Sequence, residues 1–599
     1  MPLKVYNSYT RQKEVFHSIT PGHVGMYVCG PTVSGESHLG HARPYITFDF
    51  IFRYLTYKGY KVRYVRNITD AGHFEEEGKE AEDKVGKKAI LEKLEPMELV
   101  QKYTNLFHWA MMQFNCLEPS IEPTATGHIV EQINMIEKII AEGYAYEVND
   151  SVYFDLKKYA ATHDYGKLSG RVMDELLETT RELDGQQEKR DKADFALWKS
   201  AAPEHIMRWK SPWGEGFPGW HIECSAMATK YLGAEFDIHG GGMDLQFPHH
   251  ESEIAQSTIC NHHAPAKYWI HNNMITINGK KMGKSYNNVI KLTEMFSGNH
   301  PLLSQAFTPM TVRFFILQSH YRSPVDFSSE ALQASEKALK RLWEAYQVLK
   351  KLQVGTSEKG TDTSLETKVL QWINEFDEFM DDDFSTAKIL ANMFELAPVI
   401  NGIKDGHIPT NAITGSTLIL LQQQFKIYLE DVFGLTQTTS GDDGALQGVM
   451  QLLIDIRKES KAKKDYATSD KIRNQLTTLG IELKDEKDGG MSWQPFRPFK
   501  NKKGEFVFLN NATQRAYLII ENGIIICHFI KDKTKNKLPE VRVFEPINYF
   551  KTANIQELIR FEQKPKRVFF GEKHGPWHFS DDLYFTEQEF KTAFLDFLK

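Results

Sequence analysis

The segment 29–43, CGPTVSGESHLGHAR, brings a cysteine, three glycines and two histidines into one short loop. Its part 30–37 matches the nucleotide-binding pattern G-x-x-x-x-G-K-[ST] at both glycines and at the final serine, but Glu36 stands where the lysine belongs. A carboxylate there would repel phosphate, so the P-loop interpretation fails. Any chemistry in this loop rests on Cys29, His38 and His41, although two ordinary histidines near a helix start are the commoner source of such a pair.

A second candidate site is PHHESEIAQ, 248–256, in which His249 and Glu253 stand four residues apart. On a helix this pair faces one side, a turn apart, which is a spacing that metal ligands use. The zinc-protease pattern H-E-x-x-H is excluded because Ile254 occupies the place of its second histidine. A helix-surface pair without a metal is the alternative interpretation.

Two distant cysteines extend this candidate. Cys29 ends a predicted strand, and Cys224 lies in PGWHIECSAM. Zinc accepts thiolate, imidazole and carboxylate together, so both cysteines with His249 and Glu253 form a chemically sensible ligand set. Spacing alone cannot join ligands from three distant segments, and burial as a small apolar side chain is the commoner fate of a free cysteine.

The third candidate is NGKKMGKSYNN, 278–288, which holds two glycines, three lysines and a serine. Such a composition suits a mobile cationic loop that binds polyphosphate. Taken alone, it is also typical of a solvated turn.

These candidates need a fold that positions them. The runs 24–29 and 61–69 predict short strands, and 42–60 predicts an amphipathic helix that stops at Gly59. Together they predict a βαβ unit with the two histidines near the carboxyl end of its first strand, where doubly wound α/β folds bind their ligands.

The remaining pattern predicts further parts. Residues 116–215 have the character of an insertion, with a hairpin predicted at 145–156. From about 328 the pattern is almost wholly helical, up to Gly480. After Trp493 it becomes β-rich, and Asn522-Gly523 between two apolar runs predicts another hairpin.

Composition and charge limit the classes of protein to which this chain can belong. The 599 residues are 41% hydrophobic, and neither a signal-peptide core nor an apolar run of about 18 residues is present, so we expect a cytoplasmic protein without a membrane segment. Five cysteines without a C-x-x-C pair are unlike a disulfide framework. The net charge of −7 is unevenly spread, because residues 496–599 carry +5 and the preceding residues −12.

Eight motifs in order carry a resemblance. HLGH followed by KMGKS resembles the paired signatures of class I aminoacyl-tRNA synthetases. The whole set resembles the cysteinyl-tRNA synthetase family over about residues 3–495: YVCGPTV, HLGHAR, YVRNITD, DFALWK, PGWHIECSAM, FDIHGGG, FPHHESEIAQS and MDDDFSTA. The resemblance implies a ligase that makes cysteinyl-adenylate from cysteine and ATP and transfers the cysteinyl group to tRNA(Cys).

The resemblance also implies roles for individual residues. The expected zinc ligands are Cys29, Cys224, His249 and Glu253. ATP, with Mg²⁺, would be bound by His38, His41, Lys281 and Lys284, of which His38, His41 and Lys284 would act in catalysis. The residues expected around the bound amino acid are Gly30, Thr32, Thr69, Trp220, His239 and Asp244.

For the architecture, the resemblance implies an α/β fold: a Rossmann-like catalytic domain in two halves, a connective insertion between them, a helical region after them, and an appendage without an assigned role. We expect a monomer. The predicted boundaries are 1–115, 116–215 (insertion), 216–327, 328–440 (helical bundle), 441–495 (anticodon-binding region) and 496–599 (β-rich or α+β appendage).

Two departures from the family pattern stand out. Gly283 occupies a loop position where serine is commoner, and a longer charged segment, 71–89, follows NITD. Two alternative functions stay open. A ligase joining cysteine to an amino-sugar would not need the helical region after 328, and a non-catalytic RNA-binding relative would be expected to have lost signature residues.

Overall fold

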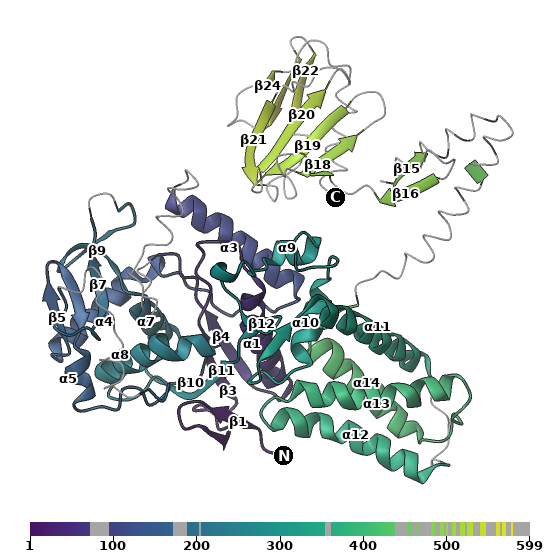
Figure 1. Cartoon of the computed structure of the whole chain (residues 1–599), viewed down its shortest axis with the longest axis horizontal. Helices are drawn as coiled ribbons and strands as arrows, with labels where there is room; N and C mark the ends of the chain where they lie inside the picture. Colours follow the sequence, from purple (N-terminus) through teal and green to yellow (C-terminus); the bar gives the residue numbers. More distant parts are fainter. Residues whose placement is uncertain are drawn as a thin grey trace. The chain divides into compact units, whose positions relative to one another are not determined.

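A computed structural model describes the chain in two compact units, Met1–Thr438 and Thr439–Lys599 (Figure 1). The residues described are 1–71, 95–171, 188–202, 205–353 and 361–437, isolated positions between 453 and 476, and the backbone of the strands between 481 and 578. The charged segment 71–89 lies, apart from its first residue, outside the described residues.

A four-stranded parallel sheet forms the centre of the first unit, in the order β11-β10-β3-β4. Its strands are β3 (His23–Val28), β4 (Lys61–Arg66), β10 (Phe236–Gly242) and β11 (Ala266–Asn272). Two strand–helix–strand units, far apart in the sequence, therefore join side by side through β3 and β10. The predicted α/β class and the first βαβ unit are confirmed.

Helices connect and cover these strands. They are α1 (Leu39–Tyr57), α7 (Trp220–Leu232) and α8 (Glu251–Asn261). The first helix begins three residues earlier than the apolar pattern predicted, with His38 as its N-cap residue. The HLGH motif therefore forms the first turn of α1, at the carboxyl edge of the sheet.

The insertion contains a separate antiparallel sheet in the order β5-β6-β7-β9-β8. The predicted hairpin is confirmed as β5 (Ala145–Val148) and β6 (Ser151–Phe154). Its turn residues Asn149 and Asp150 have φ of 49° and 60°, which asparagine and aspartate tolerate better than most residues. The other strands are β7 (Phe195–Ser200), β8 (Trp209–Ser211) and β9 (Gly214–Pro218).

The predicted helical region is confirmed for the residues described up to 432. It comprises α11 (Ser329–Lys351), α12 (Thr363–Asp381), α13 (Thr386–Lys404), α14 (Gly415–Lys426) and a π-helical turn (Ile427–Val432). One apolar core runs from the sheet into these helices, through Val28, Phe48, Phe314 and Phe376. The helical region is thus packed onto the sheet rather than tethered to it.

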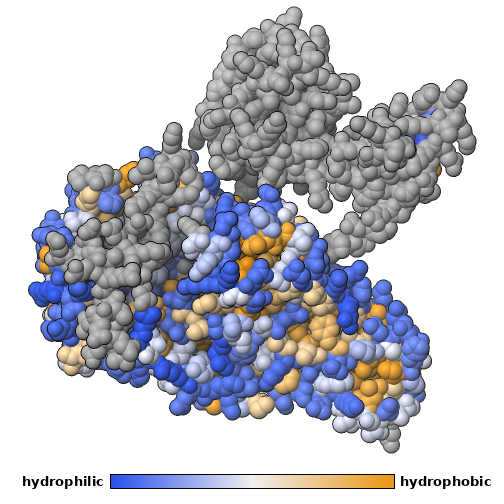
Figure 2. Space-filling model, in the orientation of Figure 1, coloured by the Kyte–Doolittle hydropathy of each residue, from blue (hydrophilic) through white to orange (hydrophobic). Residues whose placement is uncertain are grey.

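Smaller elements complete the first unit. They are β1 (Lys4–Asn7), β2 (Gln12–Val15), α3 (Pro96–Gln113), α4 (Ile129–Ala141), α5 (Leu156–Ala160), β12 (Ile275–Ile277), β13 (Lys280–Lys281), α9 (Leu292–Ser297), α10 (Pro309–Leu317) and β14 (Val325–Phe327). The face drawn in Figure 2 is largely hydrophilic, with scattered apolar patches. Among the described residues, every helix is too short or too polar to span a bilayer.

The second unit is described mainly by its strand backbone. A two-stranded ladder pairs β15 (Ile481–Asp485) with β16 (Met491–Pro495). The hairpin predicted around Asn522-Gly523 is confirmed, because β19 (Arg515–Glu521) pairs antiparallel with β20 (Ile524–Ile530). These two belong to a five-stranded sheet with β17 (Phe499–Lys500), β18 (Phe506–Asn510) and β21 (Glu540–Pro546), and a three-stranded sheet holds β22 (Ile559–Gln563), β23 (Lys566–Phe570) and β24 (Trp577–His578).

Candidate active site

The four predicted metal ligands lie together at the carboxyl edge of the parallel sheet. The Sγ atoms of Cys29 and Cys224 are 4.0 Å apart, and Cys29 Sγ lies 3.8 Å from Glu253 Oε1. His249 Nε2 lies 3.1 Å from the same carboxylate oxygen, so the predicted helix-face pair is confirmed. One donor atom of each residue lies within 4.8 Å of the others, and all four residues are buried.

The charges in this cluster compensate one another. Burial raises the pKa of the Cys224 thiol, but the hydrogen bond from Cys29 and the nearby His249 bring it down to about 6. Burial likewise raises the pKa of Glu253, while His239 and His249 lower it to about 2. Burial lowers the pKa of His249, but the nearby Cys224 and Glu253 outweigh this effect and raise the pKa to about 10. The three shifts support one another, because the imidazole of His249 favours the charged forms of Cys224 and Glu253, and both of these favour its charged form.

Three further buried histidines support the cluster, and the sequence analysis missed them. His221 Nδ1 lies 3.0 Å from His249 Nδ1, and His250 Nε2 lies 3.2 Å from Cys29 Sγ. His271 Nε2 lies 2.8 Å from His250 Nδ1. Burial lowers the pKa of His221 and His250 well below the usual range and that of His271 to about 3, so all three are neutral.

These histidines had different signals in the sequence. His250 is the second histidine of PHHES, and His221 is the histidine of PGWHIECSAM. His271 becomes recognisable only from the strand order, since β11 lies beside β10 with His271 opposite Gly241. Because of these neighbours, a second set of donors also meets metal-site geometry: Cys29, His239, His250 and Glu253.

Three of the residues expected around the amino acid lie where the backbone of the first loop meets the end of β4. The Gly30 N–H donates to Asn67 Oδ1 at 2.8 Å. A Cβ atom on Gly30 would lie 1.4 Å from the Asn67 carbonyl oxygen, so only glycine fits. Thr32 and Thr69 form a parallel bridge, which ties this loop to the strand beside it.

The other three expected residues come from the second half of the chain. The Trp220 ring lies 4.3 Å, centroid to centroid, from the His249 ring. His239 Nε2 lies 2.9 Å from Glu253 Oε2, and its ring stacks on Trp269. Asp244 is exposed, in a 3₁₀ turn just beyond β10. Trp220 and His239 thus touch the cluster.

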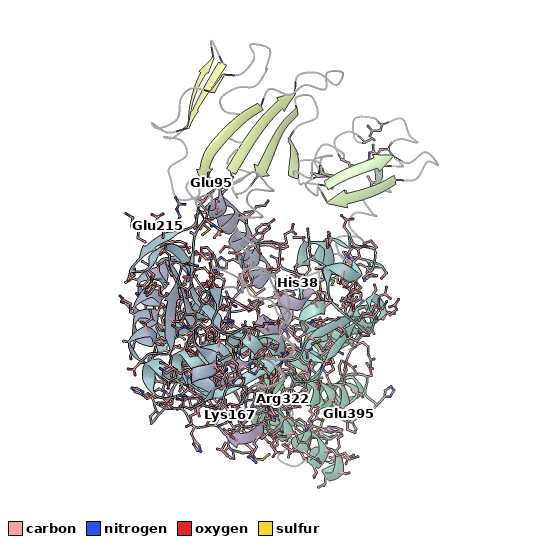
Figure 3. All side chains as sticks on the ribbon, turned by 60° about the vertical axis from the view of Figure 1, so that its left-hand side comes forward. His38, Glu95, Lys167, Glu215, Arg322 and Glu395 are labelled. Atoms are coloured by element: carbon pink, nitrogen blue, oxygen red, sulfur yellow. The ribbon has the colours of Figure 1, made fainter. Side chains whose placement is uncertain are left out.

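The histidines of HLGH stack on each other at the N-terminus of α1, with ring centroids 3.8 Å apart. The His38 N–H donates to His41 Nδ1 at 3.2 Å. Burial, then the neighbouring His38, lowers the pKa of His41 to about 3. His41 is therefore neutral, and because Nδ1 accepts a hydrogen bond, its proton sits on Nε2. Figure 3 shows His38 inside the outline of the first unit.

The lysine loop approaches HLGH through the backbone. His38 forms an antiparallel bridge with Lys291, and the Leu39 N–H donates to the Ile290 carbonyl at 2.9 Å. Glu36, which broke the P-loop pattern, accepts a hydrogen bond from Thr293 Oγ1 at 2.7 Å and lies 3.4 Å from Lys291 Nζ. Its carboxylate joins the two segments and is partly neutralised there.

Within the loop, Lys281 is exposed in β13 and Lys284 begins a 3₁₀ turn; the Lys284 side chain lies outside what the structure describes. Asn288 accepts from the Gly283 N–H at 2.9 Å and donates to the Lys281 carbonyl at 3.1 Å. A Cβ atom on Gly283 would make only ordinary contacts, the nearest at 3.6 Å to Tyr286, so packing does not require glycine there.

Comparisons with known proteins agree with this arrangement. A model of the class I (C) tRNA synthetase catalytic domain matches residues 15–337, and a model of the DALR domain matches residues 375–437. The cysteine-tRNA ligase of Bacteroides fragilis is 57% identical over 490 residues, which cover 81% of this chain and 98% of that protein. The chain belongs to the cysteine-tRNA ligase family.

Other relatives support the same family. The cysteine-tRNA ligase of Porphyromonas gingivalis is 55% identical over 491 residues, which cover 82% of this chain and 98% of that protein. The cysteine-tRNA ligase of Cytophaga hutchinsonii is 53% identical over 488 residues, which cover 81% of this chain and 98% of that protein. These cysteine-tRNA ligases are matched almost in full, while about a fifth of this chain lies outside each match.

The neutral state of His41 predicts a pH effect on stability. The native pKa of about 3 lies below the usual value of 6.5, so between these values only the unfolded chain binds the proton. This contribution to stability is present above about pH 6.5 and is lost as the pH falls. We expect the stability difference between the native protein and His41→Gln to shrink from pH 7.5 to pH 5.5, measured by denaturant unfolding.

The exposed His407, in the loop after α13, offers a matched control. The same measurement on His407→Gln gives the effect of replacing a histidine that the fold leaves exposed. If the His41→Gln difference stayed constant, His41 would not be held neutral by the fold.

Proposed function

We propose that this chain is a cysteine-tRNA ligase, which activates cysteine with ATP and transfers the cysteinyl group to the 3′-terminal adenosine of tRNA(Cys). The observation that carries the proposal is the buried set of two cysteines, one histidine and one glutamate, at the same edge of the sheet as the HLGH turn. Cysteine-dependent exchange of pyrophosphate into ATP, followed by charging of tRNA(Cys), tests it.

The donor set of this cluster fits zinc. Thiolate, imidazole and carboxylate are all zinc ligands, and one donor atom of each of the four residues lies within 4.8 Å of the others. We assign Cys29, Cys224, His249 and Glu253 rather than the alternative set with His239 and His250, because two thiolates suit zinc better than one. His249 would release its proton on binding, since only a neutral imidazole can ligate.

When bound, zinc would supply a soft cation that accepts the substrate thiolate and discriminates against the hydroxyl of serine. The protein's own residues fix the geometry of this site. His239 orients Glu253 through its Nε2 contact of 2.9 Å, and His221 orients His249 at 3.0 Å. Discrimination at the thiol would remove the need for a separate editing site.

The residues at the N-terminus of α1 would act on ATP. Free N–H groups and the dipole at a helix N-terminus favour an anion, and His41 offers a neutral Nε2–H donor there. As the cysteine carboxylate attacks the α-phosphorus and pyrophosphate departs, His38, His41 and Lys284 would stabilise the charge on the phosphoryl oxygens, with Lys281 helping to bind ATP and its Mg²⁺. Gly30, Thr32, Thr69, Trp220, His239 and Asp244 are proposed to surround the amino acid.

The domain roles complete the proposal. We assign 1–115 and 216–327 to the catalytic domain, 116–215 to the insertion, 328–440 to the helical bundle, 441–495 to anticodon binding and 496–599 to the appendage. We further propose a cytoplasmic monomer. Cys29 and Cys224 are free thiols and must stay reduced to bind a metal, which suits a reducing compartment.

Two other functions would keep part of this site. A cysteine–amino-sugar ligase would use the same thiol site, but the packed helical region with its DALR match favours the tRNA ligase. A non-catalytic RNA-binding protein is disfavoured because the HLGH turn and the lysine loop are both intact. Exchange without tRNA charging would indicate the first alternative, and no exchange the second.

The first prediction from the proposed function concerns the metal. Cys224→Ser replaces a thiolate by a neutral hydroxyl, so we expect loss of bound zinc together with loss of cysteine activation. Metal analysis and pyrophosphate exchange measure both. Cys260→Ser is the matched control, because Cys260 is also buried but packs against Met135, away from the cluster, and should keep its zinc. Stoichiometric zinc in Cys224→Ser would refute the ligand assignment.

A second prediction separates the phosphate site from the metal site. Lys284→Ala should lower the rate of adenylate formation by about a hundredfold or more, because a charge-stabilising group is removed, while zinc content stays the same. Lys280→Ala removes a neighbouring exposed lysine and should change the rate little. An unchanged exchange rate in Lys284→Ala would exclude this lysine from the mechanism.

A third prediction concerns the basic appendage. Because β16 ends at Pro495, a truncation after that residue keeps the β15–β16 ladder whole. We expect it to retain cysteine-dependent exchange. If the appendage binds tRNA through phosphates, the truncation should raise the KM for tRNA and flatten its dependence on salt. Equal KM values across a salt series would show that the appendage does not contact tRNA.

A further inference from the structure

The turn between α12 and α13 holds two consecutive residues in the left-handed region. Asp383 has φ of 69° and Phe384 has φ of 56°, and both are fully buried. Residues other than glycine are strained in this region, so surrounding contacts must hold the turn. The turn lies within the motif MDDDFSTA, 380–387.

The Asp383 carboxylate supplies those contacts from inside the turn. Its Oδ1 accepts from the Tyr321 hydroxyl at 2.6 Å and from the Tyr6 N–H at 2.8 Å. Its Oδ2 accepts from Arg322 Nε at 2.7 Å. His320 Nε2 lies 2.9 Å from the Asp383 carbonyl oxygen. Three consecutive residues, 320–322, are thus held by one residue of the helical region.

Arg43 also holds this segment, through backbone carbonyl oxygens. It lies in α1, two residues after His41, and is buried. Its guanidinium donates to the carbonyl oxygens of Met274 at 2.6 Å and Tyr321 at 3.1 Å, and also to that of Ser323. A lysine could not reach these divergent acceptors together, because they need the planar fork of a guanidinium.

The carbonyls that Arg43 binds lie at the base of the lysine loop. Met274 directly precedes β12, and Ser323 stands two residues before β14. These strands pair in parallel, and β12 also pairs with β13, which carries Lys281. Residues 320–323 are therefore hydrogen-bonded to α1 through Arg43, and they lead into β14, which pairs with one of the strands that present the lysine loop.

We propose that residues 320–323, held between Asp383 and Arg43, form a clamp that aligns the HLGH turn with the lysine loop, and that Asp383 is a positioning residue for adenylate formation. As a positioning residue, Asp383 acts through Tyr321 and Arg322 and not through contact with ATP or cysteine. The inference rests on the proposed function, since adenylate formation is its readout.

The neighbouring aspartate offers a matched control. Asp382 stands next to Asp383 in the same turn, but its side chain is 43% exposed and pairs with Lys13 on the surface. Asp382→Asn should leave exchange within about twofold of the native rate, because an exposed ion pair contributes little.

The test is Asp383→Asn in the full chain, which keeps the size of the side chain but removes its charge. We expect kcat for cysteine-dependent pyrophosphate exchange to fall about tenfold to a hundredfold, because misplaced groups lose alignment in the transition state. The KM for cysteine and the zinc content should stay near those of the native protein. A lower melting temperature with an unchanged kcat at 25 °C would show a structural role only and would overturn the clamp.

A second variant covers the case in which Asp383→Asn does not fold. Asp383→Gly removes the carboxylate but tolerates the positive φ, so the turn is relieved of strain. The kcat of this variant should fall to a similar extent as that of Asp383→Asn. A well-folded Asp383→Gly with the native kcat would also overturn the proposal.

A double-mutant cycle tests the connection itself. If Asp383 and Arg43 act through the same segment, Asp383→Asn combined with Arg43→Lys should lower kcat by less than the product of the two single effects. Independent, multiplicative effects would contradict a shared clamp. The failure of the proposed function is distinct, because the native protein would then show no cysteine-dependent exchange at all.

Discussion

The parallel pairing of β3 with β10 is the contact on which the site depends. It sets His239 opposite Tyr27, and the Cys29 N–H extends the ladder by donating to the Gly240 carbonyl at 3.1 Å. A Cβ atom on Gly240 would lie 2.2 Å from the Phe48 ring, so this glycine lets α1 lie close against β10. Through this one pairing, segments about two hundred residues apart place a cysteine, the HLGH turn and the His249–Glu253 helix at one edge.

The pairing also buries polar groups that need partners. A carboxylate and a thiolate in an apolar interior would be costly if they stood alone, and here the surrounding imidazoles carry hydrogen bonds and compensating charge. The neutral histidines behind them each have one donor and one acceptor nitrogen, so they can pass hydrogen bonds on to the next group without adding charge. The His250–His271 pair ends on Ser8 Oγ, 2.9 Å from His271 Nδ1.

Much of this could be predicted from the sequence, for reasons that differ by element. Periodicity located β3, α1 and β4, but it placed the helix start at Ala42, because a pattern of apolar residues cannot register that HLGH already has helical backbone. The Asn522-Gly523 hairpin was predictable because turn chemistry is local. The four metal ligands came from a resemblance between ordered motifs, since spacing could not join them.

The residues that were missed share a property: their partners are distant in sequence. His271 meets His250 only after two strands become neighbours, and Asp383 meets Tyr321 only after the helical region packs on the sheet. Arg43 was within the recognised motif, yet its partners are carbonyl oxygens, which leave no trace in a sequence. Side-chain types predict chemistry well, but backbone acceptors become visible only in a fold.

The choice of carbonyl partners for Arg43 has an electrostatic reason. An Asp or Glu beside Arg43 would cancel its charge within two residues of the HLGH histidines, where a polyanion is expected to bind. Carbonyl dipoles satisfy the guanidinium without adding negative charge, although burial lowers the pKa of Arg43 to about 10, which leaves it charged at neutral pH. Glu36, the carboxylate nearby, is held by Lys291 and Thr293. The carbonyl partners of Arg43 and the partners of Glu36 both keep the N-terminus of α1 favourable to an anion.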